Sequence, residues 1–214
     1  IRRFWVWLFA VVMILIMGIS RIYLGQHFIQ DVVAALLIGL LILAGYLIWV
    51  RYFAKNFRKR ILGQKVLAAV LVTAVIGLSY VLVLYLIGAP DLAVPWADFI
   101  PEAEIATKTE MARTFGALLG FSIGAILEGS RIRFRVEGSL KKRAVRYLFG
   151  LIIMLIIWQG LGSLFPREPI WLGIPLYIIR YGLITLWASY FAPMAFVRLR
   201  LAEADPPPEI NLKL

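Results

Sequence analysis

The sequence predicts an all-α membrane protein, a multi-pass transmembrane bundle of about six helices with both ends in the cytoplasm. Three observations lead to this fold class. Hydrophobic residues make up 62% of the 214 residues and the mean hydropathy is +0.88, whereas soluble domains are nearer half apolar. Long apolar stretches recur along the chain, and nothing alternates with the period of two that barrel strands require. Basic residues gather in alternate connections, as they do in membrane proteins with several spans.

The bounds of the expected spans follow from hydropathy, because a bilayer core requires about 20 apolar residues per helix. The spans are residues 4–20, 30–50, 66–88, 111–128, 147–165 and 169–197. The first and fourth are short, so we expect their ends to snorkel or tilt. The first also follows two arginines, as a signal peptide would. It lacks a small-residue cleavage site, however, and continues directly into a polar turn, which indicates a membrane helix.

The charge of the connections predicts the orientation of the spans. Basic residues occupy four places that six spans would put on one side of the membrane. They are Arg2, Arg3, Arg51, Lys55, Arg58, Lys59, Arg60, Lys65, Arg131, Arg133, Arg135, Lys141, Lys142, Arg143, Arg146, Arg198 and Arg200. The intervening connection at residues 89–110 is acidic. Because basic loops stay in the cytoplasm, both ends are expected there and residues 21–29 at the outer face.

Composition also limits the function classes. The formal net charge is +11, but its basic runs lie between the spans, so we expect the bilayer and not a nucleic acid as the partner. The sequence contains no cysteine, which excludes disulfides and thiolate metal sites.

One polar stretch, Ser20–Asp31, carries a possible chemical site. His27 is the only histidine, and Asp31 follows four residues later, one helical turn away. A carboxylate there would keep one imidazole nitrogen protonated and leave the other free to attack. Arg21 adds a planar fork suited to phosphate oxygens, and Gly25 permits a tight reversal. The alternative is that Arg21 and Asp31 only anchor their helices and His27 fills the turn; spacing alone leaves both open.

The order Ser20-Arg21, five residues, His27, three residues, Asp31 resembles the third signature of the type-2 phosphatidic acid phosphatase family. The resemblance implies that His27 is the nucleophile and forms a phosphohistidine. It also implies that Asp31 orients His27 and that Arg21 binds the phosphate. Ser20 belongs to the substrate-binding part of the motif without a catalytic role. No metal or other cofactor is implied.

Two further signatures of that family do not occur in this sequence. One is a Lys followed by Arg-Pro, which binds phosphate, and the other is Pro-Ser-Gly-His, whose histidine is the general acid. The chain also begins without Met. We therefore expect the later part of a longer protein, in which residues 1–50 are the last two spans of the catalytic core. Residues 51–214 would be a C-terminal membrane extension of four spans and a short tail, similar to that of some bacterial members.

The expected function is a membrane phosphatase that hydrolyses a lipid phosphate or an isoprenoid pyrophosphate at the outer face of the cell membrane, in bacteria the cytoplasmic membrane. Protein partners are not predicted. One alternative is a non-catalytic membrane subunit or a truncated relic of the family. A second is a lipid phosphotransferase with the same site. A transporter is weaker, because only Arg180 and Glu128 are candidates for charges within spans.

Two features of the extension complete the expectations. Gly116, Gly120 and Gly124 repeat every four residues, which lines one helix face with small residues and permits close helix contact. Arg180 lies deep in the last span and needs a partner or a watery cavity. A structural ion pair or snorkelling is favoured for Arg180 over a contact with a lipid phosphate.

Overall fold

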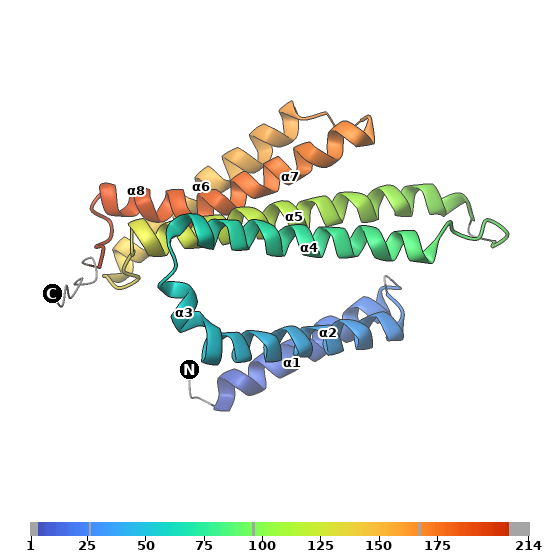
Figure 1. Ribbon diagram of the computed structural model, residues 1–214, viewed down its shortest axis with the longest axis horizontal. Coiled ribbons are helices and arrows are strands. Elements are labelled where there is room, and N and C mark those ends of the chain that lie inside the picture. Colours follow the sequence, from blue (N-terminus) through green and yellow to red (C-terminus); the bar gives the residue numbers. More distant parts are fainter. Residues whose placement is uncertain (1–3, 26, 96, 167, 206–214) are drawn as a thin grey trace. The chain divides into compact units, whose positions relative to one another are not determined.

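The computed structural model describes residues 4–25, 27–95, 97–166 and 168–205, and it is helical almost throughout (Figure 1). The α-helices are α1 (Phe4–Tyr23), α2 (Ile29–Ile48), α3 (Ala54–Arg58), α4 (Leu62–Ile87), α5 (Ile100–Arg131), α6 (Leu140–Leu164), α7 (Ile170–Leu186) and α8 (Ala192–Arg198). Two π-helical segments, Trp49–Phe53 and Trp187–Phe191, join α2 to α3 and α7 to α8. Arg2 and Arg3, which enter the charge argument, lie outside the described residues.

The expected multi-pass helical architecture is confirmed. Within the described ranges, six helical runs are long and apolar enough to cross a membrane. They are Phe4–Tyr23, Ile29–Arg58, Leu62–Ile87, Ala97–Arg131, Leu140–Leu164 and Ile170–Arg198. Large apolar side chains along them are exposed, with Leu41 at 72% and Leu78 at 69%. Surfaces of this kind need lipid or further helices to cover them.

The fourth helix is longer than the sequence predicts. The expected span began at residue 111, whereas α5 begins at Ile100, so half of the expected acidic loop is helical. Pro101 lies in the first turn, where its fixed φ suits a helix start. Lys108 pairs with Glu104 at 3.0 Å across one turn, which stabilises the helix further. Hydropathy therefore found only the apolar part of this helix.

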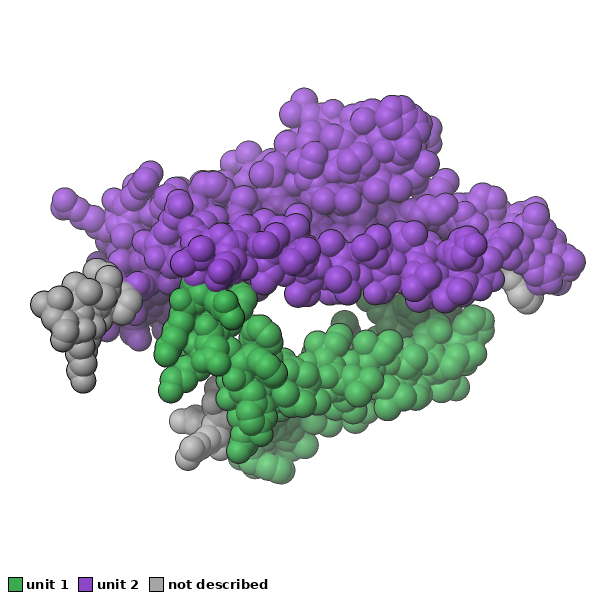
Figure 2. Space-filling model, viewed as in Figure 1, with its two compact units in different colours: residues 1–60 green, residues 61–214 purple. Residues whose placement is uncertain are grey.

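The chain divides into two compact units, Ile1–Arg60 and Ile61–Leu214, which Figure 2 distinguishes by colour. In the first unit, α1 and α2 form a hairpin in which Val32 packs against Gly18. In the second unit, α5 packs along α7 and α4, and α6 packs against α7 (Figure 1). The expected division at residue 50 stays a prediction.

The contact between α5 and α7 is backbone to backbone, as the glycine spacing predicts. Gly116, Gly120 and Gly124 are all buried. An added Cβ at Gly116 would overlap the Ile178 carbonyl, and one at Gly120 would overlap the Gly182 carbonyl. The two helices approach this closely only because the three positions carry no side chain.

Side-chain hydrogen bonds join α6 to α7 and to the π-helical segment that follows it. The indole Nε1 of Trp187 donates to the Gly150 carbonyl at 3.1 Å. The Nε and Nη2 of Arg180 donate to the Trp158 carbonyl at 3.1 and 2.6 Å. The second unit is thus held by small residues on one side of α7 and by polar ties on the other.

The connection between α5 and α6 is an ordered structure around Arg146. The sequence places Arg146 among the basic loop residues, but it lies on α6 and is only 5% exposed. Its guanidinium donates to the carbonyls of Arg135, Val136 and Glu137 at 3.1, 2.8 and 3.3 Å. The expected place of Arg146 in the connection is therefore wrong, because α6 begins earlier and the connection folds its carbonyls around the side chain.

The same connection pairs with the chain that follows α8. The Arg135 amide donates to the Glu203 carbonyl at 2.9 Å, and the Asp205 amide donates to the Arg133 carbonyl at 2.8 Å. Arg135 and Asp205 add an ion pair of 3.0 Å. Residues 133–135 and 203–205 thus form a short antiparallel pairing at the basic end of the second unit.

Candidate functional site

The site residues come from the reversal between α1 and α2. Arg21 lies in the last turn of α1, where a cation is favourable because the helix dipole is negative there. The turn follows with amide bonds from Leu24 to the Ser20 carbonyl and from Gly25 to the Ile22 carbonyl, both 3.0 Å. Gly25 has a φ of +66°, a left-handed conformation that favours glycine. The sequence-based expectation of a glycine turn here is confirmed.

Asp31 caps the start of α2. It is the third helical residue, and its Oδ2 accepts the backbone N–H of Phe28, the residue before the helix, at 2.9 Å. This is the returning half of a capping box, which satisfies one of the free amides at a helix start. The carboxylate is therefore held in a fixed position by the backbone.

His27 faces the same carboxylate oxygen. Its Nδ1 lies 3.7 Å from Asp31 Oδ2, within ion-pair range but longer than a hydrogen bond. The side chains of His27 and Asp31 are 52% and 49% exposed. The predicted proximity is present, although its reason differs from the one expected. His27 lies before α2, so the two residues do not share a helical turn. The hydrogen bond from the Phe28 amide instead turns the Asp31 carboxylate toward His27.

Arg21, His27 and Asp31 line one groove between α1 and α2, with a volume of about 360 Å³. Apolar side chains form the rest of its wall: Ile14, Met17, Val32, Ala35 and Leu36, with Gly18. Sequence reasoning missed this apolar wall. Its signal was the helical spacing of residues 14, 17, 18 and 21 on α1 and of residues 31, 32, 35 and 36 on α2.

Ser20 does not line this groove. Its hydroxyl donates to the Met17 carbonyl at 2.9 Å within α1, as serines in helices commonly do. The structure therefore brings three of the four motif residues together and leaves the Ser20 side chain on its own helix.

Two family models match the chain. The model described as the PAP2 superfamily matches residues 1–55. The model described as the PAP2 superfamily phosphatase, transmembrane extension, matches residues 112–204. Together they cover well over half of the sequence.

The chain belongs to the PAP2 superfamily. The PAP2 match contains Ser20, Arg21, His27 and Asp31, and the match to the PAP2 extension contains the α5–α7 contact and Arg180. Comparison with curated proteins and with solved structures finds no match. PAP2 membership and the membrane-spanning helices support a membrane phosphatase in general.

Proposed function

We propose that the natural protein is a membrane phosphatase that acts on a lipid phosphate or an isoprenoid pyrophosphate through a phosphohistidine intermediate. The observation that carries the proposal is the groove in which Arg21, His27 and Asp31 meet within the part of the chain that matches PAP2. An arginine, an imidazole and a carboxylate are the groups that phosphoryl transfer to histidine requires.

The chemistry proceeds in two steps. With Asp31 facing Nδ1, the carboxylate favours a proton on that nitrogen and leaves the Nε2 lone pair free. Nε2 attacks phosphorus, the bond from phosphorus to the leaving oxygen breaks, and that oxygen takes a proton from a general acid. Arg21 balances the charge on the phosphoryl oxygens. A water molecule then attacks the phosphohistidine, which releases phosphate and restores His27.

The shape and charge of the groove favour an amphipathic substrate. The ionisable groups lie at the α1–α2 turn, and the apolar wall continues along both helices. A phosphate at Arg21 and His27 would leave a hydrocarbon chain along Ile14, Met17 and Ala35. The basic residues after α2 lie at the opposite end of this hairpin. The positive-inside rule then directs the site to the outer face.

The described lining of the groove leaves no further ionisable group for the general acid, because His27 is the nucleophile, Asp31 faces it and Arg21 binds the phosphate. Loss of a general acid typically lowers turnover by about 10²–10⁴-fold. Assays therefore belong on the natural protein in its membrane.

The test is the replacement His27→Ala, measured as phosphate release from phosphatidic acid and from an isoprenoid pyrophosphate in proteoliposomes. We expect turnover to vanish and no acid-labile phosphoprotein to form on mixing with substrate. Tyr23→Phe is the matched control and should keep wild-type turnover, since Tyr23 is 89% exposed and does not line the groove. Full activity of His27→Ala would rule out the nucleophile. Repeating the assay with an acceptor lipid distinguishes hydrolysis from phosphoryl transfer.

A further inference from the structure

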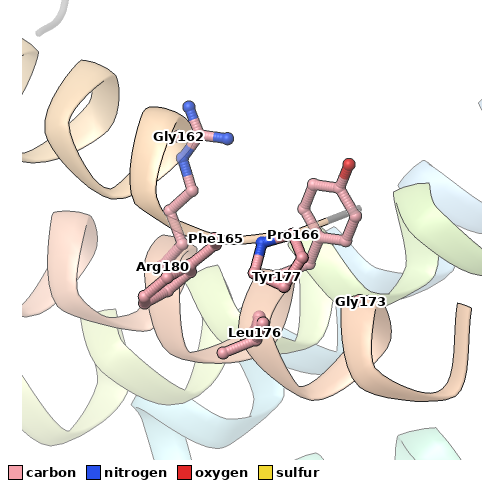
Figure 3. A pocket seen from close by; sticks show the side chains of 7 residues that line it. All are labelled: Gly162, Phe165, Pro166, Gly173, Leu176, Tyr177 and Arg180. Atoms are coloured by element: carbon pink, nitrogen blue, oxygen red, sulfur yellow. The ribbon is translucent and has the colours of Figure 1, made fainter. Parts of the chain in front are cut away.

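Arg180 places a cation at the end of a membrane-spanning helix pair in the second unit. Its Cα lies ten residues after the start of α7, about 15 Å along the helix. Side chains of a helix lean toward its N-terminus, and the Arg180 guanidinium lies beside Gly162 (Figure 3). Gly162 belongs to the last turn of α6, which ends at Leu164. The guanidinium therefore reaches toward the α6–α7 turn, the direction in which a long cationic side chain snorkels from a membrane-spanning helix.

The hydrogen bonds of Arg180 use only part of its donor capacity. Nε and Nη2 both donate to one acceptor, the Trp158 carbonyl, and the guanidinium stacks on the Trp158 ring with 5.4 Å to its centroid. Among the residues the structure describes, no carboxylate pairs with Arg180 and Nη1 makes no hydrogen bond. The sequence favoured a structural ion pair or snorkelling for Arg180. The described residues contain no such ion pair, so no carboxylate among them balances the positive charge.

A small pocket opens beside this guanidinium. Its wall includes Gly162, Pro166, Gly173, Tyr177 and Arg180. The pocket is partly open, and its cavity volume of about 10 Å³ is room for one oxygen atom. Gly162 makes this arrangement possible, because an added Cβ would lie 2.7 Å from the Arg180 Cζ. Tyr177, one turn before Arg180, also lines this pocket, and its hydroxyl points in the same direction as the guanidinium (Figure 3).

The neighbouring Arg113 and its carboxylate partner do not balance the positive charge of Arg180. Arg113 of α5 lies over the Tyr177 ring at 5.1 Å and over the Tyr181 ring at 5.7 Å. Arg113 is itself paired with Glu110. The pair adds no net charge, so the cationic excess of Arg180 remains and an anion is favoured there.

We propose that this pocket binds the phosphate group of an anionic lipid. One phosphate oxygen enters the pocket and accepts hydrogen bonds from Arg180 Nη1 and from the Tyr177 hydroxyl. The hydrocarbon chains then lie on the outer surface of the hairpin, where Leu164 and Trp171 are 75% and 72% exposed. The site differs from the His27 groove, which belongs to the other unit, and the proposal does not depend on catalysis at His27.

The test uses the full natural protein in nanodiscs, with a phosphatidic acid that carries a photoreactive acyl chain. All variants carry His27→Ala, which stops any turnover of the probe. Crosslinks are mapped by mass spectrometry to residues 158–180. Unlabelled phosphatidic acid, diacylglycerol and inorganic phosphate serve as competitors, so that a lipid phosphate, a lipid chain and a free anion are told apart.

We expect Arg180→Gln to lower the crosslinking of residues 158–180 by about tenfold and Tyr177→Phe by about threefold. Arg143→Gln, the control, removes an exposed cation from the other end of α6 and should change nothing. Phosphatidic acid should compete, whereas diacylglycerol should not.

Unchanged crosslinking in a folded Arg180→Gln protein would overturn the proposal, as would equal competition by diacylglycerol. Effective competition by inorganic phosphate would contradict the lipid assignment and leave a free-anion site. Arg180→Gln also removes the hydrogen bonds to the Trp158 carbonyl. If this variant does not fold, the proposal is tested by Tyr177→Phe and by the competition experiments with the unaltered pocket.

Discussion

Replacing Gly120 with alanine should destabilise the second unit by forcing α5 and α7 apart. An added Cβ would stand 2.7 Å from the Gly182 carbonyl carbon and 2.5 Å from Thr185 Oγ1, whereas ordinary contact begins at 3.4 Å. The helices then have to separate by about 1 Å, and overpacking of this kind costs on the order of 3 kcal/mol. Alanine recovers about 1 kcal/mol through its higher helix propensity. The expected net loss of unfolding free energy is therefore ~2 kcal/mol.

The assay is unfolding of the purified protein by increasing SDS in mixed micelles, followed by tryptophan fluorescence. Gly129→Ala is the matched control on the same helix, since nothing lies within 4 Å of an added Cβ there. The control should be as stable as the unaltered protein or slightly more so. If Gly120→Ala unfolds at the same SDS fraction as Gly129→Ala, the close approach of α5 to α7 does not stabilise the second unit, and the prediction is wrong.

Three further predictions concern the site, the orientation and the basic end. Asp31→Asn keeps an oxygen to accept the capping amide, so stability should stay near wild type while turnover falls by about 10²-fold or more; an unchanged rate would show that the charge facing His27 is not needed. Because the sequence has no cysteine, Leu24→Cys in whole cells should react with an impermeant maleimide and Lys59→Cys only after permeabilisation; the reverse pattern would invert the proposed topology. Arg146→Met leaves three loop carbonyls without their donor and should cost about 3 kcal/mol. Trypsin cleavage in the α5–α6 connection should accelerate in this variant, whereas Arg143→Met, on an exposed position, should leave it unchanged.

Local features of the chain account for what the sequence could predict. Apolar runs decide which segments can cross a bilayer, so all six spans were found. The first turns of α5, residues 100–110, were not, because they are stabilised by Pro101 and the Glu104–Lys108 pair and are not apolar. The glycine spacing predicted a close contact of α5 but not its partner. Identifying α7 requires the tertiary fold.

The candidate site was likewise predicted only in part from the sequence. The motif predicted that His27 and Asp31 would meet, and they do, but through a helix cap that spacing alone did not reveal. The apolar wall of the groove depends on how α1 and α2 face each other. The burial of Arg146 was not predicted, because it depends on how the adjacent connection folds its backbone carbonyls around the side chain, which charge patterning does not reveal.

The pairing of residues 133–135 with residues 203–205 can form only late in the synthesis of the chain. Residues 133–135 are synthesised about 70 residues before residues 203–205, at about 5–20 residues per second. Two membrane crossings are completed in the interval. The Arg135 amide and the Arg133 carbonyl therefore form these hydrogen bonds only after Glu203 and Asp205 have been synthesised. The segment after α8 therefore pairs with the α5–α6 connection last, and a chain that stops before residue 203 would lack both backbone hydrogen bonds.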